Sequence, residues 1–242
     1  MTTSPTSPTQ TQTSRVPIKT SPTRTATPTR PVRPNPTNTS RTPTRPVTPR
    51  TASSGSGGFS ASVRATTADD VRYTYRPGCP VGASDLRTIT MTYRTYTGQV
   101  RTGVLIVARE HASSVVGLFR QAFEAGFRIN RMDNPNLWKG DDVQMMAADN
   151  TSAFNCRQVT GNASGLSPHS YGTAIDVNTR RNPYRAANDV WYPSNGSRWI
   201  DRSVDDVGVI RSSSTITRAL LRSGGIWGGT WADPDYQHFE VG

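Results

Sequence analysis

Two short segments of the chain combine histidines with acidic residues at spacings that suit a metal site. The sequence has only three histidines. His169 precedes Asp176 within SPHSYGTAIDVN, and His238 follows Asp235 within DPDYQHFE. Imidazole nitrogens and carboxylate oxygens are ordinary zinc ligands, at about 2.0–2.2 Å from the ion.

A catalytic zinc ion uses three protein ligands and keeps its fourth position for water, whose pKa falls to about 7. His169, Asp176 and His238 would supply these ligands for one Zn²⁺ per chain, and Asp235 would be left as a general base. A His and an Asp at this spacing also occur by chance, and a lone His is more often a satisfied surface or core residue. The sequence lacks HExxH, which excludes the common zincin architecture.

The elements around these residues can be predicted from side-chain alternation. Residues 173–178 favour a strand, with Ile175 and Val177 facing the core and Asp176 on the opposite face. Gly172 allows a turn that lets His169 approach the same point. The last histidine opens a predicted terminal strand, HFEV.

The rest of the domain is a mixture of a hairpin, helices and short strands. Residues 86–108 predict a hairpin, in which Ile89, Met91 and Tyr93 share one face. Helices are expected at 112–125, around 145–148 and at 213–223, and further strands at 127–132 and 153–159. Because there is no βαβ rhythm, these elements predict a single α+β domain.

Composition places this domain at residues 59–242. Residues 1–58 contain eleven prolines and eight Lys or Arg but no acidic residue, which predicts a disordered basic tail. The tail accounts for +8 of the net charge of +11. It could bind anionic wall polymers or keep the protein soluble, whereas the domain shows no aromatic or recognition-helix motif for nucleic acid.

Targeting signals conflict with one another. No run of 18 apolar residues predicts a membrane span, and the N-terminus lacks the apolar region of a secretory signal. A Thr/Ser/Pro-rich stretch is nevertheless typical of exported proteins.

Two cysteines, Cys79 and Cys156, fit no zinc-finger spacing. They are therefore either two buried thiols or a disulfide, and the exported character of the chain favours the disulfide.

The two histidine segments resemble the signature stretches of the zinc D-alanyl-D-alanine carboxypeptidase and L-alanyl-D-glutamate peptidase family. The resemblance covers about residues 71–242 and also includes residues 149–157 (DNTSAFNCR), 76–81 (RPGCPV) and 227–229 (WGG). It implies the hedgehog/DD-peptidase fold, with a mixed sheet and flanking helices. It also implies a zinc peptidase that cuts peptidoglycan stem peptides outside the cell or in the cell wall.

The resemblance assigns the same roles to the metal-centre residues and adds one more. His169, Asp176 and His238 correspond to the zinc ligands, and Asp235 to the catalytic base. Arg157 corresponds to an arginine that holds the substrate or its developing oxyanion. The alternative is a non-catalytic wall-binding module with the same fold. In a third interpretation the main function is that of the basic tail, which tethers the protein to anionic polymers, and the domain is carried with it.

Several neighbouring residues can be interpreted in two ways. Asp233 competes with Asp235 as the base but is offset from the family pattern, and Glu240 is either a partner of a ligand histidine or an exposed carboxylate. Tyr171, Trp227 and Trp231 are expected in the core. The acidic pairs Asp141–Asp142 and Asp205–Asp206 are expected in solvated loops or at helix starts.

Overall fold

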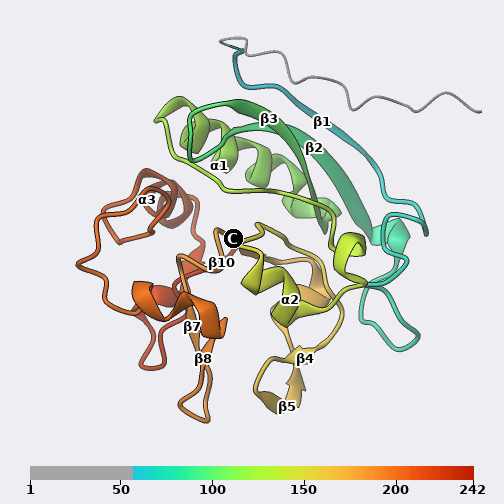
Figure 1. Ribbon diagram of the computed structural model, residues 1–242. Helices are drawn as coiled ribbons and strands as arrows, with labels where there is room; N and C mark the ends of the chain where they lie inside the picture. Colours follow the sequence, from blue (N-terminus) through green and yellow to red (C-terminus); the bar gives the residue numbers. More distant parts are fainter. Residues whose placement is uncertain (1–56) are drawn as a thin grey trace, which may run out of the picture. The chain divides into compact units, whose positions relative to one another are not determined.

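The computed structural model describes residues 57–242, so the predicted tail lies outside the described residues except for its last two positions (Figure 1). The described part mixes small sheets with three α-helices, in agreement with the predicted α+β class. The hedgehog/DD-peptidase architecture itself stays a prediction. Among the described residues, none of the helices has the length and apolar character needed to cross a bilayer.

The first sheet contains the predicted hairpin. Strand β2 (Leu86–Arg94) pairs antiparallel with β3 (Val100–Ala108) and with β1 (Ala61–Ala65), in the order β1-β2-β3. Gly98 has a φ of +87° in the β2–β3 turn, where a residue without a side chain is favoured. The sequence did not reveal β1, since this strand is largely exposed and carries no alternating pattern.

Helix α1 (Ala112–Glu124) confirms the predicted helix and covers the apolar face of this sheet (Figure 1). Ile89, Met91 and Tyr93 are buried on that face, as their alternation predicted. The helix contributes Val115, Leu118, Phe119, Ala122 and Phe123 to the same core. The Val, Leu and Phe side chains among these each contribute about 1.5–3 kcal/mol when they are fully buried.

The second sheet contains two of the predicted metal-ligating residues. Strand β10 (His238–Glu240) lies between β6 (Ala174–Asp176) and β9 (Ile226–Trp227), and both neighbours are antiparallel to it. Helix α3 (Thr215–Arg222) packs on β9 and α1. Ile175 and Phe239 are fully buried in the core that the α1 layer also lines.

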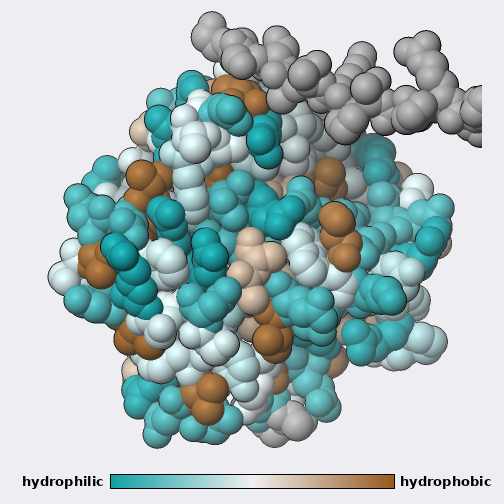
Figure 2. Space-filling model, viewed as in Figure 1, coloured by the Kyte–Doolittle hydropathy of each residue, from teal (hydrophilic) through white to brown (hydrophobic). Residues whose placement is uncertain are grey.

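Shorter elements complete the domain. Helix α2 spans Asp142–Ala147, and two-stranded hairpins are formed by β4 (Gln158–Val159) with β5 (Asn162–Leu166) and by β7 (Tyr184–Arg185) with β8 (Trp191–Tyr192). Short 3-10 helices occupy Ala83–Asp85, Arg109–His111, Pro135–Trp138, Pro168–Tyr171, Ser194–Trp199 and Gly228–Thr230. Hydrophobic side chains on the face shown in Figure 2 are scattered among polar ones and form no continuous patch.

Two predicted strands are wrong in extent. Residues 127–132 form only isolated bridges, because the N–H of Asn130 bonds to the side chain of Asn178 and not to a neighbouring strand. Within 153–159 only Gln158–Val159 is a strand. The N–H groups of Phe154, Asn155 and Cys156 bond to three different segments, at Ile106, His169 and Thr74, so no ladder can form.

The predicted helix around 145–148 begins earlier, at Asp142, because the side chain of Asp141 caps it by accepting a hydrogen bond from the N–H of Gln144. The favoured disulfide between Cys79 and Cys156 is present, with a Cα–Cα distance of 6.0 Å. It joins the segment before β2 to the residue that precedes Arg157.

Candidate metal centre

His169 is held in place by the short 3-10 helix Pro168–Tyr171. The Ser167 side chain caps this helix at its start by accepting a hydrogen bond from the N–H of His169. Gly172 ends it with a φ of +73°, and a Cβ there would lie 2.7 Å from the backbone nitrogen of Ala108. That nitrogen donates to the Gly172 carbonyl at 2.9 Å, so the absence of a side chain at Gly172 lets the helix dock on the end of β3.

The His169 ring presents one nitrogen to Asp176. Its Nδ1 lies 2.7 Å from the Ala153 carbonyl oxygen, which can only accept, so Nδ1 carries the hydrogen. Its other nitrogen, Nε2, lies 3.0 Å from Oδ2 of Asp176. Two electron-rich atoms at this distance require a positive charge between them, either a proton or a metal ion.

Asp176 and His238 lie directly opposite each other in the antiparallel β6–β10 ladder. Residues paired in this way project to the same face of a sheet. Oδ1 of Asp176 is 3.3 Å from Nδ1 of His238. The other His238 nitrogen, Nε2, is 3.4 Å from Oε1 of Glu240, which supports the interpretation of Glu240 as a partner that orients the ligand.

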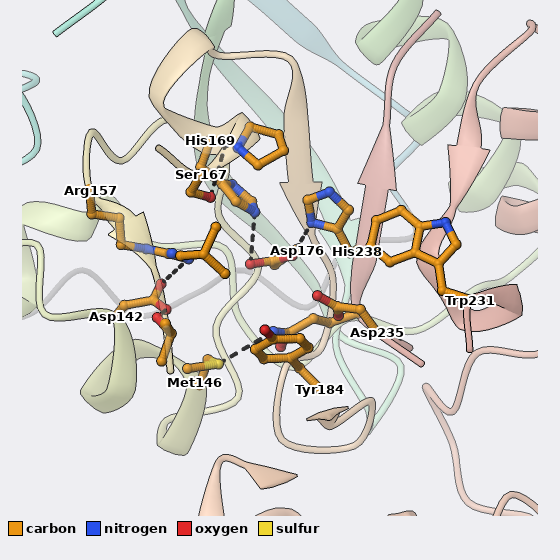
Figure 3. A pocket seen from close by; sticks show the side chains of 14 residues that line it. Asp142, Met146, Arg157, Ser167, His169, Asp176, Tyr184, Trp231, Asp235 and His238 are labelled. Carbon is orange, nitrogen blue, oxygen red and sulfur yellow. Dashed lines mark hydrogen bonds and ion pairs between the residues drawn. The ribbon is translucent and has the colours of Figure 1, made fainter. Parts of the chain in front are cut away.

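The three predicted ligands therefore converge. Their candidate donor atoms lie within 4.8 Å of one another. All three residues are buried: His169 is 3% exposed, Asp176 4% and His238 5%. Two ligands about 2.1 Å from one tetrahedral zinc would be about 3.4 Å apart, close to both contacts of Asp176. Figure 3 shows the two imidazoles on either side of this carboxylate. The donor set fits zinc.

The electrostatics of the group also favour a bound cation. Burial by itself raises the pKa of Asp176, but the adjacent His169 and His238 outweigh burial and hold this pKa far below its usual range. For His238, burial lowers the pKa, while Asp176 and Glu240 raise it more, to about 10. Both shifts have the same cause: the buried carboxylate of Asp176 favours positive charge on the groups beside it.

Asp235 lies beside this group and is 8% exposed. Its backbone N–H donates to the Gly228 carbonyl at 3.0 Å. A Cβ on Gly228 would lie 2.9 Å from the Asp235 carbonyl oxygen and 3.0 Å from the Trp231 ring. Burial raises the pKa of Asp235 to about 7, a shift that His238 opposes and Asp176 reinforces.

Arg157 reaches the same pocket, although it comes from an irregular segment. Its backbone is fixed by Ser170, whose hydroxyl oxygen accepts from the Arg157 N–H at 3.1 Å and donates to the Arg157 carbonyl at 3.0 Å. The guanidinium forms an ion pair with Asp142. The pocket has a volume of about 130 Å³ and is lined by Arg157, Asp235 and all three predicted ligands.

Nine other residues line this pocket that the sequence did not assign to the site, among them Asp142, Trp231 and Tyr184. Asp142 lies at a helix start, one of the two places expected for it, but its side chain is only 12% exposed because it faces Arg157. Trp231 was expected in the core, yet it is 41% exposed and its ring lies 5.4 Å from that of His238. Tyr184 also lines the pocket, and no sequence signal distinguishes it.

Asp233, Trp227 and Tyr171 do not line this pocket. The side chain of Asp233 is 54% exposed and paired with Arg185, which disfavours it as the base. Trp227 is in the core as expected, whereas Tyr171 is exposed at the surface.

Residues 160–241 match the D-alanyl-D-alanine carboxypeptidase family model. The predicted family resemblance is thereby confirmed for this segment, which includes His169, Asp176, Asp235 and His238. Arg157 precedes the matched segment. No curated protein and no solved structure matches the chain. The family match supports a peptidase, and hence a hydrolase.

Proposed function

We propose that the protein is a zinc peptidase that hydrolyses a peptide bond in the stem peptides of peptidoglycan. The observation that carries this proposal is the convergence of His169, Asp176 and His238 beside Asp235 in one pocket, within the segment that matches the carboxypeptidase family. The bond is of the D-Ala-D-Ala or the L-Ala-D-Glu type. Such a substrate places the protein outside the cell or in the cell wall.

His169 through Nε2, Asp176 through its carboxylate and His238 through Nδ1 would hold the zinc ion. When bound, zinc supplies a Lewis acid that polarises a carbonyl and makes water acidic at neutral pH. Glu240 would keep His238 oriented through its Nε2.

Asp235 would act as the proton carrier. Its carboxylate takes a proton from the attacking water as the new C–O bond forms, and returns it to the leaving nitrogen as the C–N bond breaks. Burial raises the pKa of Asp235 in the metal-free site, and a group that must both accept and release a proton works best when its pKa lies near the working pH. Arg157 would donate hydrogen bonds to the carbonyl oxygen as negative charge develops on it.

The basic residues of positions 1–58 would add a separate contact with anionic wall polymers. Because that contact is independent of the pocket, a variant without residues 1–58 should cleave soluble muropeptides at the rate of the full chain. Slower cleavage of soluble substrate by this variant would show that residues 1–58 also contribute to catalysis in the pocket, and would contradict the proposal that the two act independently.

The proposal is tested by digesting purified peptidoglycan and identifying new peptide termini by mass spectrometry, together with zinc analysis of the protein. Asp235→Asn should retain zinc and lose turnover, whereas the exposed Asp233→Asn should behave as wild type. Absence of both zinc and new termini in the wild-type digest would overturn the proposal. Zinc with bound but uncleaved muropeptides would favour the wall-binding module.

A further inference from the structure

We infer that Asp142 is a positioning residue that fixes the guanidinium of Arg157 at the wall of the pocket. This inference rests on the proposed function, in which Arg157 faces the substrate carbonyl. Asp142 Oδ1 lies 2.8 Å from Nη2 of Arg157. No local pattern in the sequence indicates this contact, because an irregular stretch of the chain separates the two residues.

Both oxygens of Asp142 are engaged, so the carboxylate itself has a defined orientation. Its Oδ2 accepts a hydrogen bond at 2.6 Å from the hydroxyl of Thr160, in the turn of the β4–β5 hairpin. Its backbone belongs to the first turn of α2. Asp142 therefore links α2, the Arg157 segment and the β4–β5 hairpin at one side of the pocket. Figure 3 shows its carboxylate facing the guanidinium of Arg157.

Arg157 needs such a partner because its side chain is long and only partly held elsewhere. The side chain is 15% exposed, and Nη1 donates to the Gln158 carbonyl at 3.1 Å. Its Nε is buried without a hydrogen-bond partner. A free arginine side chain loses rotamer entropy when it is immobilised. An ion pair that forms before the substrate arrives fixes the side chain in the folded protein, so this entropy is not lost again when the substrate binds.

The geometry and the charge of Asp142 have opposite effects on Arg157. The ion pair orients the guanidinium, but the negative charge also weakens its pull on a developing oxyanion. If orientation dominates, a neutral residue that keeps an acceptor oxygen should preserve most of the function. Asp142→Asn keeps that oxygen, and Asp142→Ala removes it.

The test measures kcat/KM on soluble muropeptides with the full-length, zinc-loaded protein. Asp142→Ala should lower kcat/KM about ten-fold or more, and Asp142→Asn should recover most of this loss. In an Arg157→Ala background, Asp142→Ala should have no further effect, because its role is exerted through Arg157. Equal losses in the wild-type and Arg157→Ala backgrounds would overturn the inference, as would equal losses for Asn and Ala.

Asp141→Ala is the matched control. Asp141 caps the same helix without contacting Arg157, so this variant should lower the melting temperature and keep kcat/KM. A loss of activity equal to that of Asp142→Ala would mean that α2 stability alone explains the effect, and would overturn the inference.

A second measurement separates this inference from the proposed function. In ¹⁵N NMR spectra of the metal-free protein, hindered rotation of the Arg157 guanidinium should be visible in the wild type and lost in Asp142→Ala. An inactive wild type with this pattern would overturn the peptidase alone. An active wild type whose Arg157 signals do not respond to Asp142→Ala would overturn the positioning role alone.

Discussion

Oδ1 of Asp176 lies 3.3 Å from Nδ1 of His238, across two antiparallel strands that pair these residues directly. The same register pairs Ile175 with Phe239 on the opposite, fully buried face. The strand register that packs the core therefore also places the two ligands side by side. A slip of one residue would bury the ligands in the core and expose the apolar pair.

Asp176→Asn is expected to abolish tight zinc binding. The amide keeps the shape of the carboxylate but removes the negative charge that both histidines face. Zinc affinity should fall more than about 100-fold, beyond the loss typical of an outer-shell partner. Competition with a chromogenic chelator measures this, and Asp233→Asn, which alters an exposed acid, serves as the control. Unchanged affinity in Asp176→Asn would remove Asp176 from the ligand set.

Gly228→Ala should impair turnover without removing zinc. A Cβ at this position would lie 2.9 Å from the carbonyl oxygen and 3.1 Å from the Cβ of Asp235, so the base must shift. Displacement of a catalytic group by about 1 Å can cost about 100-fold in rate. Gly117→Ala provides a matched control, because it adds the same methyl group into open space on α1. Wild-type kcat in Gly228→Ala would show that Asp235 tolerates the shift or is not the base.

The metal-free protein should lose stability as the pH rises from about 4 to 7. Burial raises the pKa of Asp235 to about 7 from its ordinary 3.8, so over this range the folded state binds a proton that the unfolded chain has released. Asp235→Asn removes the cost of a buried charge, and should therefore gain about 1–3 kcal/mol over the wild type at pH 8 and less than half of that gain at pH 5.

Denaturant unfolding in the presence of a chelator, at both pH values, measures this difference. Asp233→Asn should track the wild type at both, because its carboxylate is exposed. A gain for Asp235→Asn that is equal at pH 5 and pH 8 would show that ionisation of Asp235 is not its cause.

Reduction of the disulfide should destabilise the domain and disturb Arg157. The two cysteines are separated by 77 positions in the sequence. Because the bond restricts the unfolded chain, its loss should increase the entropy of that chain and lower the free energy of unfolding by about 4 kcal/mol. Cys156 directly precedes Arg157, so activity should fall at temperatures where the domain remains folded. The chain has no other cysteine, so the Cys79→Ser/Cys156→Ser double variant tests the same bond without a reductant. A melting temperature equal to that of the wild type would contradict the expected stabilisation.

Part of the site was predictable because it depends on local periodicity. The alternation in residues 173–178 placed Ile175 and Asp176 on opposite faces whatever the neighbouring strand, and Gly172 indicated the turn that brings in His169. The β2–β3 hairpin and helix α1 were predictable for the same reason, since their apolar residues repeat at strand and helix spacing.

The sequence by itself determined which side chains could bind a metal and which faces of their strands they occupy. Only the tertiary structure decided that His238 stands opposite Asp176, that Asp142 faces Arg157, and that Trp231 borders the pocket rather than the core. These contacts join segments far apart in the chain, and residues 152–156 bond to a different segment at almost every N–H. Such pairings depend on the path of the whole chain, and no local spacing of residues encodes them.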